Sequence, residues 1–133
     1  MNKIIFVSAL VFLFILSACN PQKMLSKRLV GEWAIVSYEE RNREGANPTM
    51  TNIGTITFNN DMTGTKAVSY SIMQVAYLDD KPFQWENTEN TVTLDGEESD
   101  FAKVWFIQEN KKTTQEWRST DSEGNVQIMR LRR

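Results

Sequence analysis

The chain contains no histidine and only one cysteine among its 133 residues. Histidine is the usual general base at neutral pH and the commonest metal ligand, so its absence excludes Ser-His-Asp and Cys-His catalysis. A single cysteine excludes an internal disulfide, a CxxC redox pair and a thiolate zinc site. The 15 basic and 17 acidic residues give a net charge of −2, which argues against nucleic acid as the main partner. We therefore expect one domain that is not an enzyme and needs no cofactor.

The only long hydrophobic run lies at the start of the chain. Lys3 precedes residues 4–16, which are apolar except for Ser8. This run is shorter than the roughly 20 residues that a helix needs to cross the hydrocarbon core of a bilayer, so it predicts a secretory signal peptide over residues 1–18. The closing sequence Leu-Ser-Ala-Cys, which ends at Cys19, resembles a bacterial lipobox. The resemblance implies cleavage before Cys19 and attachment of a diacylglycerol, with fatty acids such as palmitate, to its sulfur.

A lipidated Cys19 would make the membrane the first partner of the protein. Several acyl chains anchor a protein stably, because each buried methylene contributes about 0.8 kcal/mol. We expect residues 19–28 to be a lipidated tether in which residues 20–26, if extended, reach about 25 Å. Asn20 is not the aspartate that retains many such lipoproteins at the inner membrane, so the resemblance favours the outer membrane. The alternative is an ordinary cleaved signal peptide with an incidental cysteine.

After residue 30 the dominant hydrophobic period is two residues, which is typical of strands with one buried face. Turn-forming residues separate these segments, for example Asp79 to Pro82 and Asp121 to Asn125. The pattern predicts eight strands, at 33–39, 53–58, 64–77, 83–86, 91–94, 101–108, 113–119 and 126–131.

Eight short strands joined by turns predict an all-β antiparallel meander. It could close into a barrel or fold into a two-sheet sandwich, and a barrel of eight strands is just wide enough for side chains or one small ligand. We expect the barrel domain to occupy residues 29–133, preceded by one helical turn within residues 24–30. Residues 40–52 contain Gly45 and Pro48 and read as an open loop or lid.

The start of this domain resembles a known family. Leu29, Gly31 and Trp33 form an L-x-G-x-W motif, and the later pattern is loosely similar to small bacterial lipocalin-like lipoproteins through residue 131. The resemblance implies a lipocalin-like barrel in which Gly31 permits a close chain approach. It also implies that Trp33 plugs one barrel end against an arginine of the last strand, Arg130 or Arg132, as a cation–π partner.

The inward-facing apolar residues allow two interpretations. They could line a pocket for a small hydrophobic ligand, together with polar groups such as Tyr77, as most small-molecule sites do. They could equally fill the barrel as a solid core, as aromatic residues at strand spacing usually do. The candidate lining residues are Ile56, Phe58, Tyr70, Trp85, Leu94, Trp105 and Ile107.

The charged clusters in the sequence do not predict a functional site. Residues 95–100 carry several carboxylates but lack the spacing of a calcium loop, so we expect a solvated acidic turn and no metal site. Arg130, Arg132 and Arg133 are fewer than the four to eight basic residues of a lipid-binding cluster, which favours a solvated terminus. Adjacent carboxylates such as Glu97 and Glu98 point to opposite faces of a strand, so no catalytic pair stands out.

Three hypotheses about function follow. The first is a lipid-anchored cell-envelope barrel that binds a small hydrophobic ligand. The second is an envelope interaction or structural module whose barrel is solid and whose loop at 40–52 or exposed sheet face contacts a protein. An enzyme is the third and weakest hypothesis, because histidine is absent.

Overall fold

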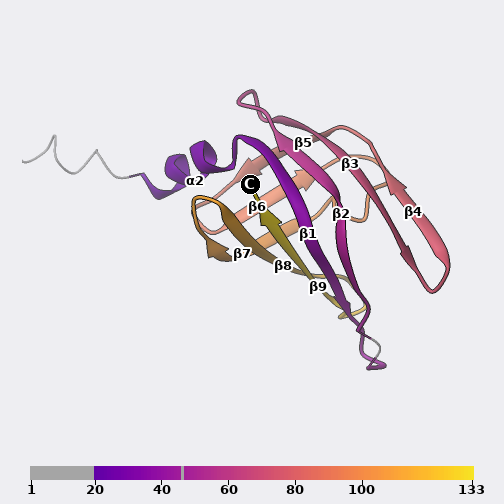
Figure 1. Cartoon of the computed structure of the whole chain (residues 1–133). Helices are drawn as coiled ribbons and strands as arrows, with labels where there is room; N and C mark the ends of the chain where they lie inside the picture. The colour runs from indigo at the N-terminus through magenta and orange to yellow at the C-terminus, as the bar shows by residue number, and fades with distance from the viewer. Residues whose placement is uncertain (1–19, 46) are drawn as a thin grey trace, which may run out of the picture.

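The computed structural model describes residues 20–45 and 47–133 of the chain. The predicted signal peptide, residues 1–18, and the predicted lipidation site Cys19 therefore lie outside the described residues. Within the described part, no helix is long and apolar enough to cross a membrane. The strands form a barrel with a short helix, α2 (Pro21–Leu29), packed at one end (Figure 1).

Helix α2 begins at Asn20, whose side chain accepts a hydrogen bond from the Lys23 backbone N–H. An Asn N-cap followed by Pro21 at the first helical position is a strong helix start. Leu25 and Leu29 are buried against the barrel. The expectation of an extended tether over residues 20–26 is therefore wrong, because the capped helix has an apolar face that the barrel end covers.

The described residues form nine strands connected as an antiparallel meander. The strands are β1 (Gly31–Arg41), β2 (Thr49–Phe58), β3 (Thr63–Ile72), β4 (Val75–Asp79), β5 (Phe83–Asn87), β6 (Thr91–Asp95), β7 (Val104–Asn110), β8 (Thr114–Thr120) and β9 (Val126–Arg132).

The sheet closes on itself. Strand β1 pairs with β2 on one side and with β9 on the other, and β2 also pairs with β3, so the ring runs β1-β2-β3-β5-β6-β7-β8-β9. This confirms the predicted eight-stranded antiparallel barrel and decides against the sandwich. The main connection between β1 and β2 is shorter than expected, because Thr49 to Thr51 pair with Ser37 to Glu39. The predicted loop or lid over residues 40–52 is thus confined to residues 42–48.

Strands β4 and β5 are two halves of one long strand opposite β3. The pair Val68/Asp79 and the pair Gly64/Phe83 share one register, so the pairing continues across the bend at residues 80–82. The predicted single strand over residues 64–77 is wrong at one point. The chain reverses at Met73 and Gln74, whose φ angles are 50° and 68°, and β4 returns along β3. In Figure 1 this β3–β4 hairpin projects at the end of the barrel opposite α2.

A buried ion pair stabilises the bend between β4 and β5. Lys66 points inward from β3, and its Nζ lies 3.0 Å from Asp79 Oδ1, with the Lys66 side chain only 2% exposed. Nζ also donates to the Lys81 carbonyl at 3.0 Å, and Ser99 Oγ donates to Asp79 Oδ2. Both charges are hydrogen bonded, as buried ions require.

Candidate functional site

The end of the barrel under α2 is sealed by Trp33. Its side chain is fully buried, and its indole Nε1 donates to the Leu29 carbonyl at 2.9 Å. The guanidinium of Arg133 lies over the ring, with Cζ 4.3 Å from the centroid. Gly31 has a φ of 123°, and a Cβ there would lie 3.2 Å from Arg133 Nη1. This closed end leaves no opening for a ligand at Trp33.

The arginine over Trp33 differs from the one expected. Arg130 instead donates to Glu116 Oε2 on the neighbouring strand at 2.9 Å, and Arg132 is exposed near the end of β9. Only Arg133 reaches back, donating to the Val30 and Arg28 carbonyls. The assignment of Arg130 as the partner of Trp33 is wrong, because Arg130 projects to the outer face, where β8 supplies a carboxylate.

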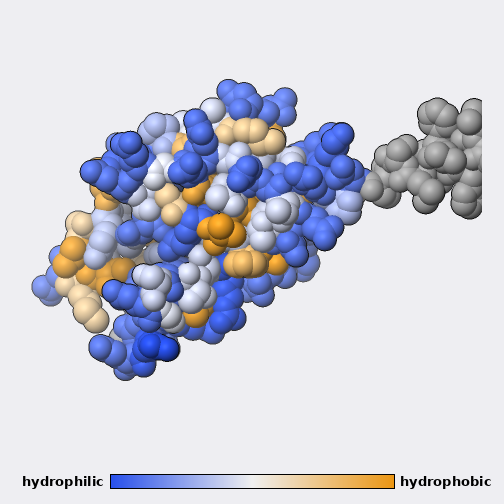
Figure 2. Space-filling model, turned by 180° about the vertical axis from the view of Figure 1, so that it is seen from behind, coloured by the Kyte–Doolittle hydropathy of each residue, from blue (hydrophilic) through white to orange (hydrophobic). Residues whose placement is uncertain are grey.

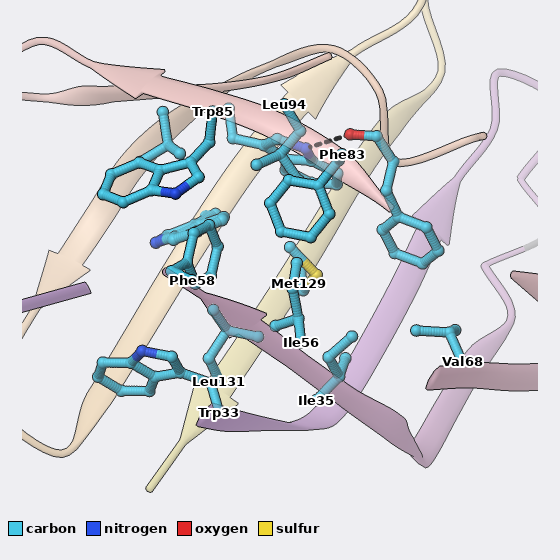
Figure 3. Close-up of a cluster of buried hydrophobic side chains, with 14 of the residues drawn as sticks. Trp33, Ile35, Ile56, Phe58, Val68, Phe83, Trp85, Leu94, Met129 and Leu131 are labelled. Atoms are coloured by element: carbon cyan, nitrogen blue, oxygen red, sulfur yellow. Dashed lines mark hydrogen bonds between the residues drawn. The ribbon is translucent and has the colours of Figure 1, made fainter. Parts of the chain in front are cut away.

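Most of the predicted lining residues form the solid middle of the barrel. Phe58 packs edge-on against Phe83, Trp85 and Trp117, with ring centroids 5.3–5.7 Å apart. Figure 3 shows Ile56 and Phe58 within this cluster, near Trp33, Trp85 and Leu94. Ile56, Phe58, Trp85, Leu94 and Trp105 are at most 3% exposed, and Ile107 packs against the cluster from its edge. Among the predicted set, Tyr70 alone borders the pocket described next.

The opposite end of the barrel is hollowed by a pocket of about 310 Å³, which we call the mouth pocket. Side chains from β1, β3, β4, β9 and the loops before β7 and β9 converge on it. The lining residues are Tyr38, Glu40, Tyr70, Ile72, Tyr77, Asp100, Lys103, Asp121 and Gln127.

Aromatic rings form the floor and one wall of the mouth pocket. Tyr70 stacks on Tyr77 with centroids 5.1 Å apart and planes 11° apart. Tyr38 packs against Tyr70 at 5.5 Å and against Phe101 at 5.2 Å. Burial raises the pKa of the Tyr38 and Tyr70 hydroxyls, with a further rise from nearby carboxylates. Both groups are therefore neutral at physiological pH and present an O–H to the pocket.

The facing wall is a polar network. Lys103 Nζ donates to Gln127 Oε1 at 3.2 Å, and Gln127 Nε2 donates to Asp121 Oδ2 at 3.2 Å. Burial lowers the pKa of Lys103, whose ammonium lies 5.3 Å from the Trp105 ring centroid. Hydrogen bonds from Asn125 and Gln127 lower the pKa of Asp121, so this carboxylate stays ionised. This wall therefore contains Lys103, whose charged form burial disfavours, and Asp121, whose charged form hydrogen bonds stabilise.

Two carboxylates of the pocket, Glu40 and Asp100, lie close enough to Lys103 to attract its charge but do not contact it. Within the described residues, neither Glu40 nor Asp100 has a hydrogen bond or ion pair from its side chain. The hydroxyls of Tyr38, Tyr70 and Tyr77 also lack protein partners in this part of the chain. The mouth pocket thus combines an aromatic floor with free acceptors, which is the composition of a site for a small amphipathic molecule.

Two other hollows lie along β5 and β6. One of about 430 Å³ borders the bend at Pro82 and Phe83, and one of about 250 Å³ is bordered by Trp85, Leu94 and their neighbours. Trp85 and Leu94 are almost fully buried, so their side chains offer little to a ligand there. Across residues 20–45 and 47–133, no group of three acidic or cysteine side chains could hold a metal ion.

The functional residues that the sequence did not reveal are the polar members of the mouth pocket. A β-bulge between Ile35 and Ser37 shifts the alternation of β1 by one residue. Tyr38 and Glu40 therefore face inward, where strict alternation from Trp33 would place Ser37 and Glu39. Asp100, Lys103 and Asp121 lie in connections, which carry no periodicity. The exception is Gln127, a polar residue between apolar neighbours in β9 that alternation could have indicated.

A closed antiparallel barrel that is sealed at one end and hollowed at the other defines a class of small β-barrel proteins with a pocket at one end. The sequence places the protein within a family of that class. Residues 29–117, more than half of the chain, match the family model described as the lipocalin-like domain, and the chain belongs to this family.

Comparison with solved structures shows barrels of designed origin. The chain is similar to a redesigned β-barrel bound to DFHBI, with 18% identity, a TM-score of 0.42 and coverage of 82% of this chain and 98% of that one. It is also similar to a de novo designed fluorescence-activating β-barrel, with 13% identity, a TM-score of 0.39 and coverage of 81% and 95%. Nothing among the curated proteins matches the chain.

Proposed function

We propose that this protein is a lipid-anchored lipocalin-like protein of the cell envelope that binds a small amphipathic molecule in the mouth pocket. The mouth pocket itself carries the proposal, because it combines stacked tyrosines with unpaired carboxylates at the only barrel end that Trp33 does not seal. The expectation of a hydrophobic ligand is thereby narrowed to an amphipathic one. An apolar or aromatic part would lie on Tyr70 and Tyr77, and a cationic group would face Glu40 and Asp100.

The charge preference follows from the lining. Glu40, Asp100 and Asp121 outnumber the single cation Lys103. A ligand cation near an ionised carboxylate at the protein surface gains on the order of 1 kcal/mol, and the face of a tyrosine ring adds a comparable cation–π attraction.

Isothermal titration with three probes of similar size tests the proposed site. Benzyltrimethylammonium, benzyl alcohol and benzoate carry a positive, zero and negative charge on the same ring. We expect affinity to fall in that order, and the double variant E40Q/D100N to weaken binding of the cation by roughly tenfold. The matched control D80N/E97Q removes two acidic residues outside the pocket and should retain the order. Equal affinity for the cation and the anion would overturn the proposed ligand class.

Lipid anchoring is supported by the sequence at residues 16–19 and has its own test. Mass spectrometry of the mature protein should show an N-terminal Cys19 bearing a diacylglycerol, and C19S should leave the detergent phase. Asn20→Asp should move the protein from outer to inner membrane fractions. Asp caps a helix as well as Asn does, so this change leaves the start of α2 intact. An unmodified Cys19 would rule out the anchor while leaving the pocket proposal standing.

The alternative is an envelope module that binds a protein partner through its surface. The β3–β4 hairpin favours it, because Met73, Val75 and Leu78 are 79%, 54% and 75% exposed. Strand β4 also pairs only with β3 among the described strands, which leaves one edge open. This alternative predicts that none of the three probes binds and that E40Q/D100N behaves like D80N/E97Q.

A further inference from the structure

Basic side chains gather around the closed end of the barrel. Lys23, Lys27 and Arg28 lie on α2, Lys111 and Lys112 form the turn between β7 and β8, and Arg133 ends the chain. We call these six residues the closed-end basic surface. In Figure 2 the surface over α2 is hydrophilic, whereas hydrophobic residues gather at the far end, over the β3–β4 hairpin.

Hydrogen bonds fix the three parts of this surface together. Arg28 Nη1 donates to the Asn110 carbonyl at 3.0 Å, which ties α2 to the β7–β8 turn. Arg133 donates through Nε to the Lys112 carbonyl at 3.2 Å and through Nη2 to the Arg28 carbonyl at 2.6 Å. Arg133 is exposed, as expected, but these hydrogen bonds hold its side chain in place, so it is not a frayed terminus. It joins the basic residues of α2 to those of the turn.

The lysines of this surface are free to meet another molecule. Lys23, Lys27, Lys111 and Lys112 are exposed, and Lys23 and Lys27 are one helical turn apart on the outer face of α2. Within the described residues, the ammonium groups of Lys23, Lys27 and Lys112 have no acceptor, and Lys111 pairs with Glu109 at 3.0 Å. Further acidic residues at this end are Glu32, Asp61 and Glu89.

The opposite end of the barrel has the reverse charge. The acidic residues of the connections on the mouth side outnumber the basic ones. The acidic residues are Glu44, Asp80, Glu97, Glu98, Asp100, Asp121 and Glu123, and the basic ones are Arg43, Lys81 and Lys103. The molecule is thus electrically polarised along the barrel axis. An anionic planar surface would attract the α2 end and repel the mouth end, and this would orient the protein before any contact forms.

The place where Cys19 joins α2 indicates that this anionic surface is the membrane. Cys19 immediately precedes Asn20, the N-cap of α2, so a lipid on Cys19 would emerge beside the closed-end basic surface. Helix α2 cannot swing away freely, because Ser26 Oγ donates to Asn87 Oδ1 at 2.6 Å and Gln22 Nε2 donates to the Asn87 carbonyl at 2.9 Å. The exposed Met24 follows Lys23 on α2 and adds an apolar side chain beside the lysines, as in helices that rest on headgroups.

We propose that the closed-end basic surface docks on the anionic phospholipids of the membrane that holds the anchor, so that the mouth pocket faces away from the bilayer. This orientation rests on the proposed lipid anchoring and adds a function for the basic residues of α2 and the β7–β8 turn. Six basic residues fall within the size of clusters that read anionic lipids. The mouth pocket would then collect its ligand from the aqueous side.

Hydrogen–deuterium exchange on the mature lipidated protein tests the orientation. The protein is reconstituted in vesicles of phosphatidylcholine alone or with 30% phosphatidylglycerol. We expect the anionic vesicles to slow exchange in residues 21–29 and 110–114 by on the order of tenfold, and to leave residues 96–103 unchanged. Salt at about 1 M should abolish the difference, since it shortens the screening length to about 3 Å.

Matched variants separate the effect of the closed-end basic surface from the effect of the protein's total charge. K23Q/K27Q/K111Q/K112Q should lose the protection, whereas R41Q/R43Q/K81Q/R118Q removes as many charges elsewhere on the protein and should keep it. Equal exchange in both lipid mixtures, or equal loss in both variants, would overturn the docking. Co-flotation with neutral vesicles tests the anchor separately. A protein that floats only with anionic vesicles supports docking and contradicts the anchor, and one that floats with neither contradicts both.

Discussion

The two ends of the barrel use aromatic side chains in different ways. At the closed end, Trp33 is fully buried and its one polar atom is bonded to the Leu29 carbonyl. At the mouth, Tyr70 and Tyr77 stack on each other, and their hydroxyls have no protein partner in the described part of the chain. A side chain whose polar group is satisfied internally serves stability. One whose polar group is left to the solvent can serve a ligand.

The largest difference between the two ends should appear on truncating these aromatics. Trp33→Ala should lower the free energy of unfolding by about 3–5 kcal/mol, because it empties a fully buried site beneath α2. Tyr77→Ala removes a ring that is 38% exposed and stacked on one neighbour, so it should cost about 1 kcal/mol. Urea unfolding of both variants measures the contrast. Similar losses would mean that the mouth is as tightly built as the closed end.

The next effect concerns the arginine that covers Trp33. Arg133→Ala removes a cation–π contact and hydrogen bonds to the carbonyls of Arg28, Val30 and Lys112, so it should cost about 1–2 kcal/mol. Arg130→Ala breaks a partly exposed ion pair with Glu116 and should cost less than about 1 kcal/mol. Thermal unfolding of the two variants decides between these roles. A larger loss for Arg130→Ala would favour Arg130, the residue that the family resemblance implies, as the more important of the two arginines.

The strand pattern was predictable because most strands have one buried and one wet face. Alternation in β3, β5 and β6 is nearly perfect, as in the burial of Phe83, Trp85 and Asn87 between exposed neighbours. With turn-forming residues between such segments, the number of barrel strands and their antiparallel order follow from local chemistry. The position of Trp33 at a barrel end came instead from the family resemblance.

Three features needed the structure because their causes are not periodic. Met73 and Gln74 reverse the chain although neither is a usual turn residue, whereas Asp79 to Pro82 look like a turn and only bend a strand. Lys66 takes an inward position that alternation gives to apolar residues, because Asp79 neutralises it from β4. The bulge in β1 makes the side chains of Tyr38 and Glu40 face the mouth pocket.

The pH dependence of stability should distinguish the mouth from the closed end. Burial lowers the pKa of Lys103 below the ordinary 10.5, so the folded protein binds fewer protons than the unfolded chain between the two values. Stability should therefore rise with pH as it passes through that window. Because Lys103 is partly solvated, the gain should stay under about 1 kcal/mol.

Lys103→Met isolates this contribution. Urea unfolding at about pH 7 and about pH 9.5 should show a smaller rise in the variant than in the original protein. Tyr38 and Tyr70, whose pKa burial raises, are present in both proteins, so their effect cancels in this comparison. The side chain of Met fits beside Trp105 without a charge, so the variant should be at least as stable at neutral pH apart from the lost bond to Gln127. An identical pH slope in both proteins would show that Lys103 is not disfavoured by burial.

The smallest effect lies at the β3–β4 turn, where two consecutive residues have positive φ angles. Met73 and Gln74 both have positive φ angles in a two-residue hairpin loop, a geometry that Asn-Gly adopts readily. The double variant M73N/Q74G should raise stability by about 0.5–1 kcal/mol, measured as a higher midpoint of thermal unfolding. The same dipeptide at residues 80 and 81, as D80N/K81G, should give no gain, because pairing with β3 resumes in the same register beyond that bend. If D80N/K81G stabilised the protein instead, the chain would reverse at residues 80 and 81, where the turn-forming residues of the sequence predict a turn.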